Sequence, residues 1–260
     1  MTTDTILLIG RATRNAQEVL ETHADRLRRR TVADVAVATY ESEPVRELRD
    51  QFERIEAETV YAVPMCAAHN HDTIDAVPAA LSYLSGDVRY CEPIGQSPAV
   101  TEAIAQRATD LVAASADTSL VLVGFGSSSK PYHRQTADYH AARLRDRSGY
   151  GEVVTCYLLQ NPTVECVRYN TTGSRSVAVP LFLTRSEATE TRIPEALELD
   201  RGGIEYADPL GTHPRVTDAV HAEVEKQRTL AADGTAGDSF EAQLTETRRP
   251  VATDGEGTRR

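Results

Sequence analysis

Two histidines, His69 and His71, lie two positions apart in the segment that follows a short apolar run, in a chain that has only seven histidines. Neutral imidazole binds divalent cobalt, nickel, iron and zinc, and it also accepts protons near neutral pH. The pair is therefore a candidate for metal binding, for proton abstraction, or for both. In the alternative interpretation, Asp72 or Thr73 caps a helix and the histidines only line its approach.

Two carboxylates, Glu41 and Glu43, follow another apolar run that ends at Tyr40. Acidic residues in this position either complete a histidine site or favour the start of a helix through the helix dipole. The sequence leaves both interpretations open.

These residues require elements that position them, and short apolar runs alternate with helical patterns along most of the chain. In the first half, strands are expected near residues 6–9, 35–39, 59–64 and 88–91, and helices near 16–29, 44–55, 73–84 and 98–114. In the second half, strands are expected near 120–123, 153–157, 176–182 and 204–206. This alternation predicts an α/β fold with doubly wound, mostly parallel sheets, in which ligands bind beyond the carboxyl ends of the strands.

The two series of elements are copies of each other. Residues 92–104 and 208–220 share six identical positions of 13, and four more are exchanges of Glu with Asp or among Ile, Leu and Val. The offset of 116 between them also takes Pro64 to Pro180. The repeat predicts two similar domains, residues 1–115 and 116–226. The polar segment 227–260 has few large apolar residues, so a disordered tail is expected there.

The other histidines differ in what they suggest. His23 and His140 occupy equivalent positions at an offset of 117, which favours a shared packing role. His133 follows the strand expected at 120–123 and is a candidate for the space between the domains. His213 and His221 are expected at the surface of the last helix.

Composition limits the class of partner. The formal charge is −11 and no basic patch is visible, so nucleic acid is not an expected partner. Only two of the 28 basic residues are lysines, which together with the acidity indicates a halophilic source. No apolar stretch is long enough to cross a membrane and no secretory signal is present, so we expect a cytoplasmic protein. Free thiols, buried or half-buried, are expected at all four cysteines: Cys66, Cys91, Cys156 and Cys166.

Nucleotide chemistry is disfavoured. Residues 124–130 contain two glycines and end in Lys130, but their spacing does not match a phosphate-binding loop, and no dinucleotide fingerprint occurs. A two-lobed small-molecule binding protein is a further alternative. Such proteins are often exported, and the lack of a signal argues against it.

Three features together resemble the class II tetrapyrrole chelatases, over about residues 5–226. They are the apolar run ending at Gly10, the stretch 63–78 with its histidines between prolines, and the Pro-Ile-Gly-x-x-Pro segment 93–98, which recurs in related form at 209–214. The likeness is to the long, two-domain CbiX type of sirohydrochlorin cobaltochelatase. It implies two flavodoxin-like domains with four-stranded parallel sheets facing across a cleft. A monomer is plausible, because two fused domains do what a homodimer of single units does.

The resemblance also implies an activity. Members of the family insert a divalent metal into a tetrapyrrole without ATP, and the long type serves cobalamin biosynthesis, so Co²⁺ is the expected metal, with Ni²⁺ and Fe²⁺ as alternatives. A family histidine after the third strand matches His71, with His69 beside it, and a family glutamate falls near Glu41. We expect the two histidines to bind the metal and abstract protons, and Glu41 to accept protons or orient a histidine.

The carboxylate-rich substrate would need cationic partners. Arg11, Arg14 and Arg185 follow expected strands, where a guanidinium can bind a carboxylate through two parallel hydrogen bonds. The chain departs from the family at one point. The histidine of the family's Gly-His-Gly-Ser run is replaced by Arg11 in the first half and by Phe125 in the second. A non-catalytic tetrapyrrole- or metal-binding relative and a sirohydrochlorin ferrochelatase therefore remain alternatives.

Overall fold

The computed structural model describes residues 4–232, which form two halves with the same order of elements. The first half contains β1 (Asp4–Arg11), α1 (Ala16–Arg28), β2 (Asp34–Tyr40), α2 (Pro44–Phe52), β3 (Thr59–Pro64), a π-helical turn (Asp72–Ala76), α3 (Val77–Ala80), β4 (Asp87–Tyr90) and α4 (Pro98–Thr109). The second contains β5 (Thr118–Gly124), α5 (Tyr132–Arg147), β6 (Glu152–Tyr157), α6 (Val167–Asn170), β7 (Arg175–Pro180), a π-helical turn (Ala188–Arg192), α7 (Ile193–Ala196), β8 (Ile204–Tyr206) and α8 (Pro214–Ala232).

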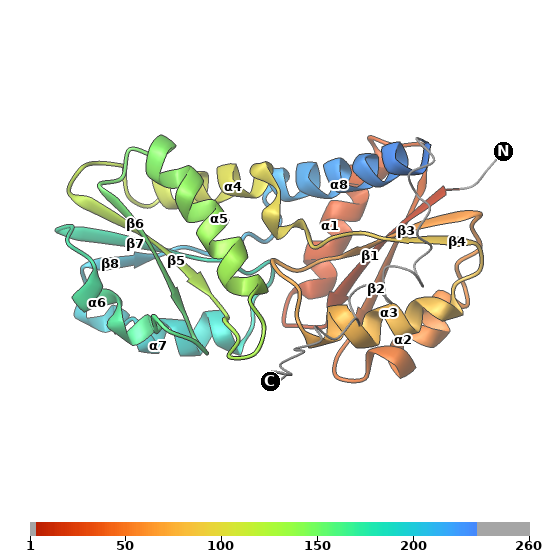
Figure 1. Ribbon diagram of the computed structural model, residues 1–260, viewed down its shortest axis with the longest axis horizontal. Helices are drawn as coiled ribbons and strands as arrows, with labels where there is room; N and C mark the ends of the chain where they lie inside the picture. Colours follow the sequence, from red (N-terminus) through yellow and green to blue (C-terminus); the bar gives the residue numbers. More distant parts are fainter. Residues whose placement is uncertain (1–3, 233–260) are drawn as a thin grey trace, which may run out of the picture.

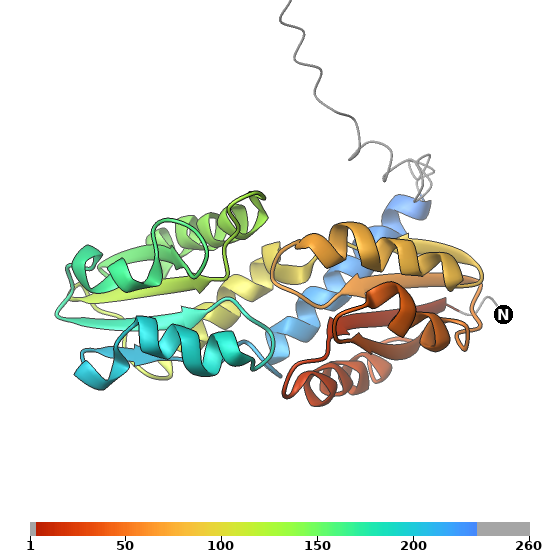
Figure 2. The ribbon, with the colours of Figure 1, turned by 90° about the horizontal axis from the view of Figure 1, so that it is seen from below.

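Each half contains one four-stranded parallel sheet. The strand orders are β2-β1-β3-β4 and β6-β5-β7-β8, so the two sheets have the same topology. Figure 2 shows the two lobes side by side along the long axis, each sheet lying between helices. The predicted fold class, two similar doubly wound domains, is confirmed.

The central strands are buried on both faces, as their apolar runs predict. In β1, Ile6 and Leu8 pack into one core cluster, whereas Leu7 and Ile9 pack into another on the opposite face. Alternation of side chains along a strand produces this division. All four residues are at most 2% exposed, so β1 holds the two layers of helices on its sheet together.

The last helix of each half covers the sheet of the other half. Helix α4 contacts β7, α8 contacts β3, and the two helices pack against each other. In Figure 1, α4 lies over the lobe of β5–β8 and α8 lies over the lobe of β1–β4. One core cluster consequently runs through both halves, from Ile6 and Val63 in the first to Leu120 and Val179 in the second. The two halves of the repeat have therefore exchanged their last helices, and neither half completes its own core alone.

A buried histidine anchors α8 to the first half. The Nδ1 atom of His23, on α1, lies 2.8 Å from the hydroxyl of Thr217, and its Nε2 atom lies 3.0 Å from the carbonyl oxygen of Gly211. Because a carbonyl only accepts, Nε2 carries the proton and Nδ1 accepts from the threonine. The imidazole is therefore held in its neutral form.

His140, on α5, makes the equivalent contacts in the other direction. Its ring bonds the hydroxyl of Thr101 at 2.8 Å and the carbonyl oxygen of Gly95. Gly95 belongs to the repeated Pro-Ile-Gly segment, and a β-carbon added there would lie 1.5 Å from the carbonyl oxygen of Ala67. The glycine lets two loops and a histidine meet at one point. The shared packing role predicted for the two histidines is confirmed.

Replacing Gly95 with alanine is expected to lower the free energy of unfolding by about 3 kcal/mol, because backbone rather than a flexible side chain must move. Urea denaturation at pH 7 measures this. Gly149→Ala is the control: Gly149, just after α5, has a φ of +75°, and the nearest atom to an added β-carbon is the β-carbon of Ala114 at 3.6 Å, an ordinary contact. Its loss should stay near about 1 kcal/mol, the cost of left-handed backbone alone. Equal losses in both variants would contradict the close approach.

Three expectations change. Helix α8 continues to Ala232, so residues 227–232 of the expected tail are helical, and residues 233–260 lie outside the described residues. His213 is buried rather than at the surface, and its Nε2 atom lies 3.1 Å from the side-chain oxygen of Gln106. Cys166 is exposed, unlike the other three cysteines, and all four are free. No helix in the described part of the chain is long and apolar enough to cross a membrane.

Candidate functional site

Two pockets lie at the boundary between the halves, with volumes of about 670 and 490 Å³. The internal repeat relates them, because an offset of 116 takes lining residues of one to lining residues of the other. In this way His69, Glu92 and Glu223 of the smaller pocket correspond to Arg185, Asp208 and Arg107 of the larger. We call the larger the arginine pocket and the smaller the histidine pocket. Both halves of the repeat thus form a pocket at the equivalent place, but the side chains that line the two pockets differ in charge and type.

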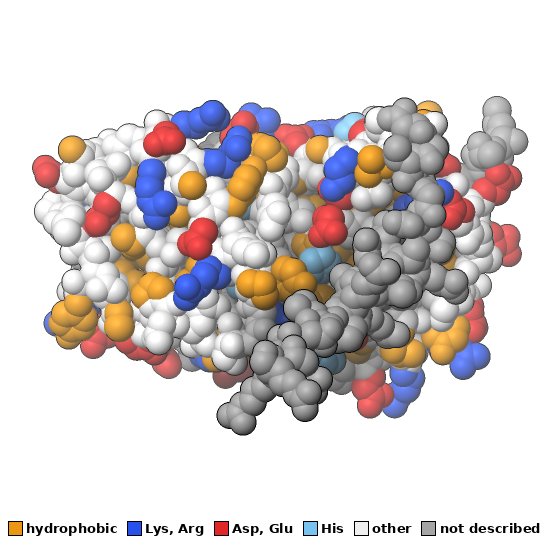
Figure 3. Space-filling model, viewed as in Figure 1, with side chains coloured by type: hydrophobic (Ala, Val, Ile, Leu, Met, Phe, Trp, Pro, Cys, Tyr) orange, Lys and Arg blue, Asp and Glu red, His pale blue; other side chains and the backbone are white. Residues whose placement is uncertain are grey.

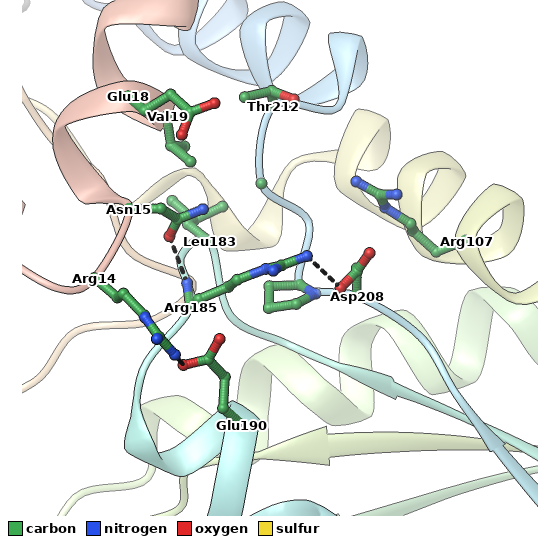
Figure 4. Close-up of a pocket in the computed structure, with 12 residues that line it drawn as sticks. Arg14, Asn15, Glu18, Val19, Arg107, Leu183, Arg185, Glu190, Asp208 and Thr212 are labelled. Atoms are coloured by element: carbon green, nitrogen blue, oxygen red, sulfur yellow. Dashed lines mark hydrogen bonds and ion pairs between the residues drawn. The ribbon is translucent and has the colours of Figure 1, made fainter.

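Ion pairs join side chains that line the arginine pocket, as Figure 4 shows. Arg14, after β1, pairs with Glu190 of the second half at 2.8 Å, and Arg185, after β7, pairs with Asp208 at 3.0 Å. The backbone N–H of Arg185 donates to the side-chain oxygen of Asn15 at 2.8 Å. The structure therefore brings together two of the three predicted substrate-binding arginines, on loops from both halves.

A third arginine of this pocket, Arg107, was missed by sequence reasoning because it lies mid-helix in α4. Its Nη2 atom donates to the carbonyl oxygen of Leu210 at 3.2 Å, while its buried Nε has no partner among the described residues. The exchange of α4 carries this arginine to the second half. Only the three-dimensional arrangement places it beside the other two.

His69 lines the histidine pocket and is held at both ring nitrogens. Its Nε2 atom lies 2.9 Å from a carboxylate oxygen of Glu92, and its Nδ1 atom lies 3.2 Å from the hydroxyl of Thr73. The ring also meets the ring of Tyr132, from α5, edge-on at 5.5 Å. The hydrogen bond from His69 lowers the pKa of Glu92. His69 therefore joins the loop after β3 to the second half, and both of its potential ligand atoms are engaged.

His71 lies in a different environment. Its side chain is 83% exposed, and its nearest charged partner is Asp75, with 3.8 Å between Nε2 and a carboxylate oxygen. The residue immediately precedes the π-helical turn after β3. Of the two histidines, His71 alone presents an open imidazole. Among the described residues, no three His, Cys, Asp or Glu side chains are arranged to hold a metal ion.

Arg11 and Glu41 lie side by side at the ends of β1 and β2. The Nε atom of Arg11 donates to the backbone carbonyl of Glu41 at 3.0 Å, and both side chains are exposed. The carboxylate of Glu47 accepts the backbone N–H groups of Glu41 at 2.6 Å, Ser42 at 3.1 Å and Glu43 at 2.7 Å. These three bonds lower the pKa of Glu47. Glu47, which the sequence did not suggest, thus fixes the loop that carries Glu41.

The predicted site residues are therefore divided among three places. Arg14 and Arg185 share the arginine pocket, His69 lines the histidine pocket, and His71, Arg11 and Glu41 are exposed beyond the strands of the first sheet. Tyr132 and Glu92, the partners of His69, were also missed by sequence reasoning. The correspondence of Glu92 with Asp208 in the repeat was the available signal.

Comparison with known proteins gives a consistent picture. The family model described as CbiX matches the chain twice, over residues 5–111 and 119–227. A curated relative, a probable sirohydrochlorin cobaltochelatase of Halobacterium salinarum, is 25% identical over 93% of this chain and 94% of its own length.

Two solved structures share the fold. SirB from Bacillus subtilis with Fe³⁺ superposes with a TM-score of 0.71 at 20% identity, covering 92% of this chain and 99% of that one. The multi-domain protein DR2241 of Deinococcus radiodurans, described as structurally similar to chelatases, has a TM-score of 0.69 at 20% identity. The match covers 86% of this chain and 55% of DR2241.

Proposed function

The chain belongs to the CbiX family, and we propose that it inserts a divalent metal, Co²⁺, into sirohydrochlorin without ATP. The curated relative is named a probable sirohydrochlorin cobaltochelatase, which supports this substrate and this metal. The observation that carries the proposal is the open imidazole of His71 at the carboxyl edge of the first sheet. This edge is where doubly wound folds bind their ligands.

Insertion requires that the metal lose part of its water shell and that two pyrrole N–H protons leave. A neutral imidazole can perform either step. We assign the metal contact to His71, because its ring is exposed. We assign proton acceptance to the carboxylate of Glu41, which follows β2. His69 takes part as a second ligand only if it leaves Glu92 or Thr73, so we assign it first to positioning the loop.

The arginines are proposed to bind the substrate carboxylates. The double variant Arg14→Ala/Arg185→Ala is expected to raise the KM for sirohydrochlorin about tenfold with little change in kcat, because charge-assisted hydrogen bonds to the substrate are lost. Steady-state kinetics measure the two constants separately. Arg29→Ala, an exposed arginine at the end of α1, is the matched control and should behave as wild type. An unchanged KM in the double variant would remove the arginine pocket from the substrate site.

Two alternatives have observations in their favour. The SirB structure described with Fe³⁺ favours a ferrochelatase, although a second SirB structure is described in complex with cobalt. Arg11 and Phe125 occupy the position of the histidine in the Gly-His-Gly-Ser run of the chelatases that the chain resembles, which favours a relative that binds a tetrapyrrole without turnover.

One experiment separates these possibilities. Purified protein is incubated with sirohydrochlorin and Co²⁺, Ni²⁺ or Fe²⁺ without ATP, and the tetrapyrrole absorbance is followed against a no-enzyme control. The assay is run at high salt, because the acidic, lysine-poor composition indicates a halophilic protein. Acceleration greatest with Co²⁺ supports the proposal. Tight sirohydrochlorin binding without acceleration by any metal would replace it with the relative that binds a tetrapyrrole without turnover.

A further inference from the structure

Phe125 is an aromatic residue without a place in the core. It directly follows β5 and is only partly buried, and it belongs to none of the three hydrophobic clusters of the described residues. Its ring nevertheless has ordered neighbours. It meets the ring of Phe182 at 6.3 Å in a T-shaped arrangement and the ring of His133 at 6.2 Å. An aromatic side chain held in place outside the core is typical of binding surfaces.

Arg192 lies over the same ring. Its guanidinium carbon is 6.0 Å from the centre of the Phe125 ring, and the side chain is partly buried. No ion pair or side-chain hydrogen bond joins Arg192 to another described residue, unlike Arg14 and Arg185, which both pair with carboxylates. Its N–H groups are therefore free for an acceptor from outside this part of the chain. It ends the π-helical turn after β7, and such turns often mark functional sites.

The segment that contacts Phe125 also contacts the first half. Phe125 and Phe182 follow β5 and β7, at the carboxyl edge of the second sheet. His133, which touches Phe125, is the chain neighbour of Tyr132, whose ring meets His69. Two neighbouring residues at the start of α5 thus contact Phe125 and the loop that also carries His71, respectively. Figure 1 shows the start of α5 close to the first lobe, near the middle of the molecule.

The repeat shows that this surface is particular to the second half. The residue equivalent to Phe125 is Arg11, and an offset of 116 places Cys66 opposite Phe182 and Ala76 opposite Arg192. The first half therefore presents charged and imidazole groups at its edge, whereas the second presents the rings of Phe125 and Phe182 beside Arg192.

We propose that Phe125 and Arg192 form a binding surface for the flat, carboxylate-bearing tetrapyrrole, opposite the metal-handling edge of the first half. The phenyl ring contacts a face of the macrocycle, and the guanidinium binds a peripheral carboxylate. This inference rests on the proposed substrate, sirohydrochlorin. It also gives the two halves different roles: residues of the first half contact the metal and accept protons, and Phe125 and Arg192 of the second half hold the macrocycle.

The test measures binding and turnover separately, on the full chain. Sirohydrochlorin without metal is titrated into wild type, Phe125→Leu, Phe125→Tyr and Arg192→Gln, and the dissociation constant is taken from absorbance changes. Phe125→Leu keeps apolar bulk and loses the flat ring, so binding should weaken about five- to tenfold, whereas Phe125→Tyr should keep wild-type affinity. Arg192→Gln should weaken binding about tenfold. In turnover, KM should rise in parallel while kcat stays within about twofold.

Tyr169→Ala, on α6, is the control, because its side chain is 85% exposed and lies outside this surface. It should bind as wild type. Wild-type affinity in both Phe125→Leu and Arg192→Gln, in proteins with unchanged melting temperatures, would overturn the inference and leave the chelatase proposal standing. A wild type that neither binds nor metallates sirohydrochlorin would overturn both.

Discussion

Replacing His71 with alanine is expected to reduce kcat for metal insertion by about 100-fold or more. In the proposed mechanism this exposed imidazole contacts the metal, and because a group that only orients a metal ligand already contributes about 10- to 100-fold, loss of the ligand itself should cost at least the upper figure. Because the side chain is 83% exposed, the variant should fold and melt as wild type. Initial rates at saturating sirohydrochlorin, together with the melting temperature, measure the effect.

His69→Ala is the informative comparison. Both nitrogens of His69 have partners in the first half, and its ring contacts Tyr132 of the second half, so its loss should loosen the contact between the halves and lower the melting temperature while kcat falls only a few-fold. His221→Ala, on α8 and outside every proposed role, should change neither quantity. If His69→Ala abolishes turnover as completely as His71→Ala while remaining folded, the two histidines act as one metal site. Full activity in His71→Ala would exclude His71 from the chemistry.

The second large effect is a loss of stability in mild acid, caused by the buried histidines that join the halves. Burial lowers the pKa of both His23 and His140 from the usual 6.5 to about 4. The unfolded chain therefore takes up these protons first. The contribution of these two histidines to the free energy of unfolding is complete above about pH 6.5. It falls as the pH drops toward 4, by about 3 kcal/mol for each histidine. Burial also lowers the pKa of His133 and His213, which adds to the loss in the same direction.

Urea denaturation at pH 7 and at pH 4.5 measures this dependence. Replacing both His23 and His140 with glutamine should lower stability at pH 7 but make the difference between the two pH values smaller by several kcal/mol. His221→Gln is the control and should keep the wild-type difference. The same difference in wild type and in the double variant would show that other groups, such as carboxylates, carry the acid sensitivity.

Much of the fold could be predicted because its signals are local. The apolar run at residues 6–9 predicts a strand buried on both faces, and the repeat at residues 92–104 and 208–220 predicts two similar units. The exchange of α4 and α8 could not be predicted. The two helices are copies with the same pattern of apolar residues, so that pattern fits either sheet equally well. The choice depends on the path of the connecting loops, which the sequence does not show.

Of the candidate site, the sequence predicted individual residues but not their partners. Position after a strand identified His69, His71, Arg14 and Arg185, since this depends only on chain order. The partners of these residues come from distant segments, as Tyr132 does for His69, and the sequence contains no signal for such a contact. Sequence reasoning therefore listed the right kinds of side chain but could not separate an engaged imidazole from an open one.

The exchanged helices also set an order for how the protein is made on the ribosome. The first sheet is complete at Tyr90, yet α8, which shares one face of this sheet with α1, begins only at Pro214. Domains commonly fold one after another as the chain emerges, but here the part of this face over β3 stays uncovered while the whole second sheet is synthesised. During that interval the nascent chain is a natural client for chaperones, and a second nascent chain nearby could lend its own helix to the waiting sheet.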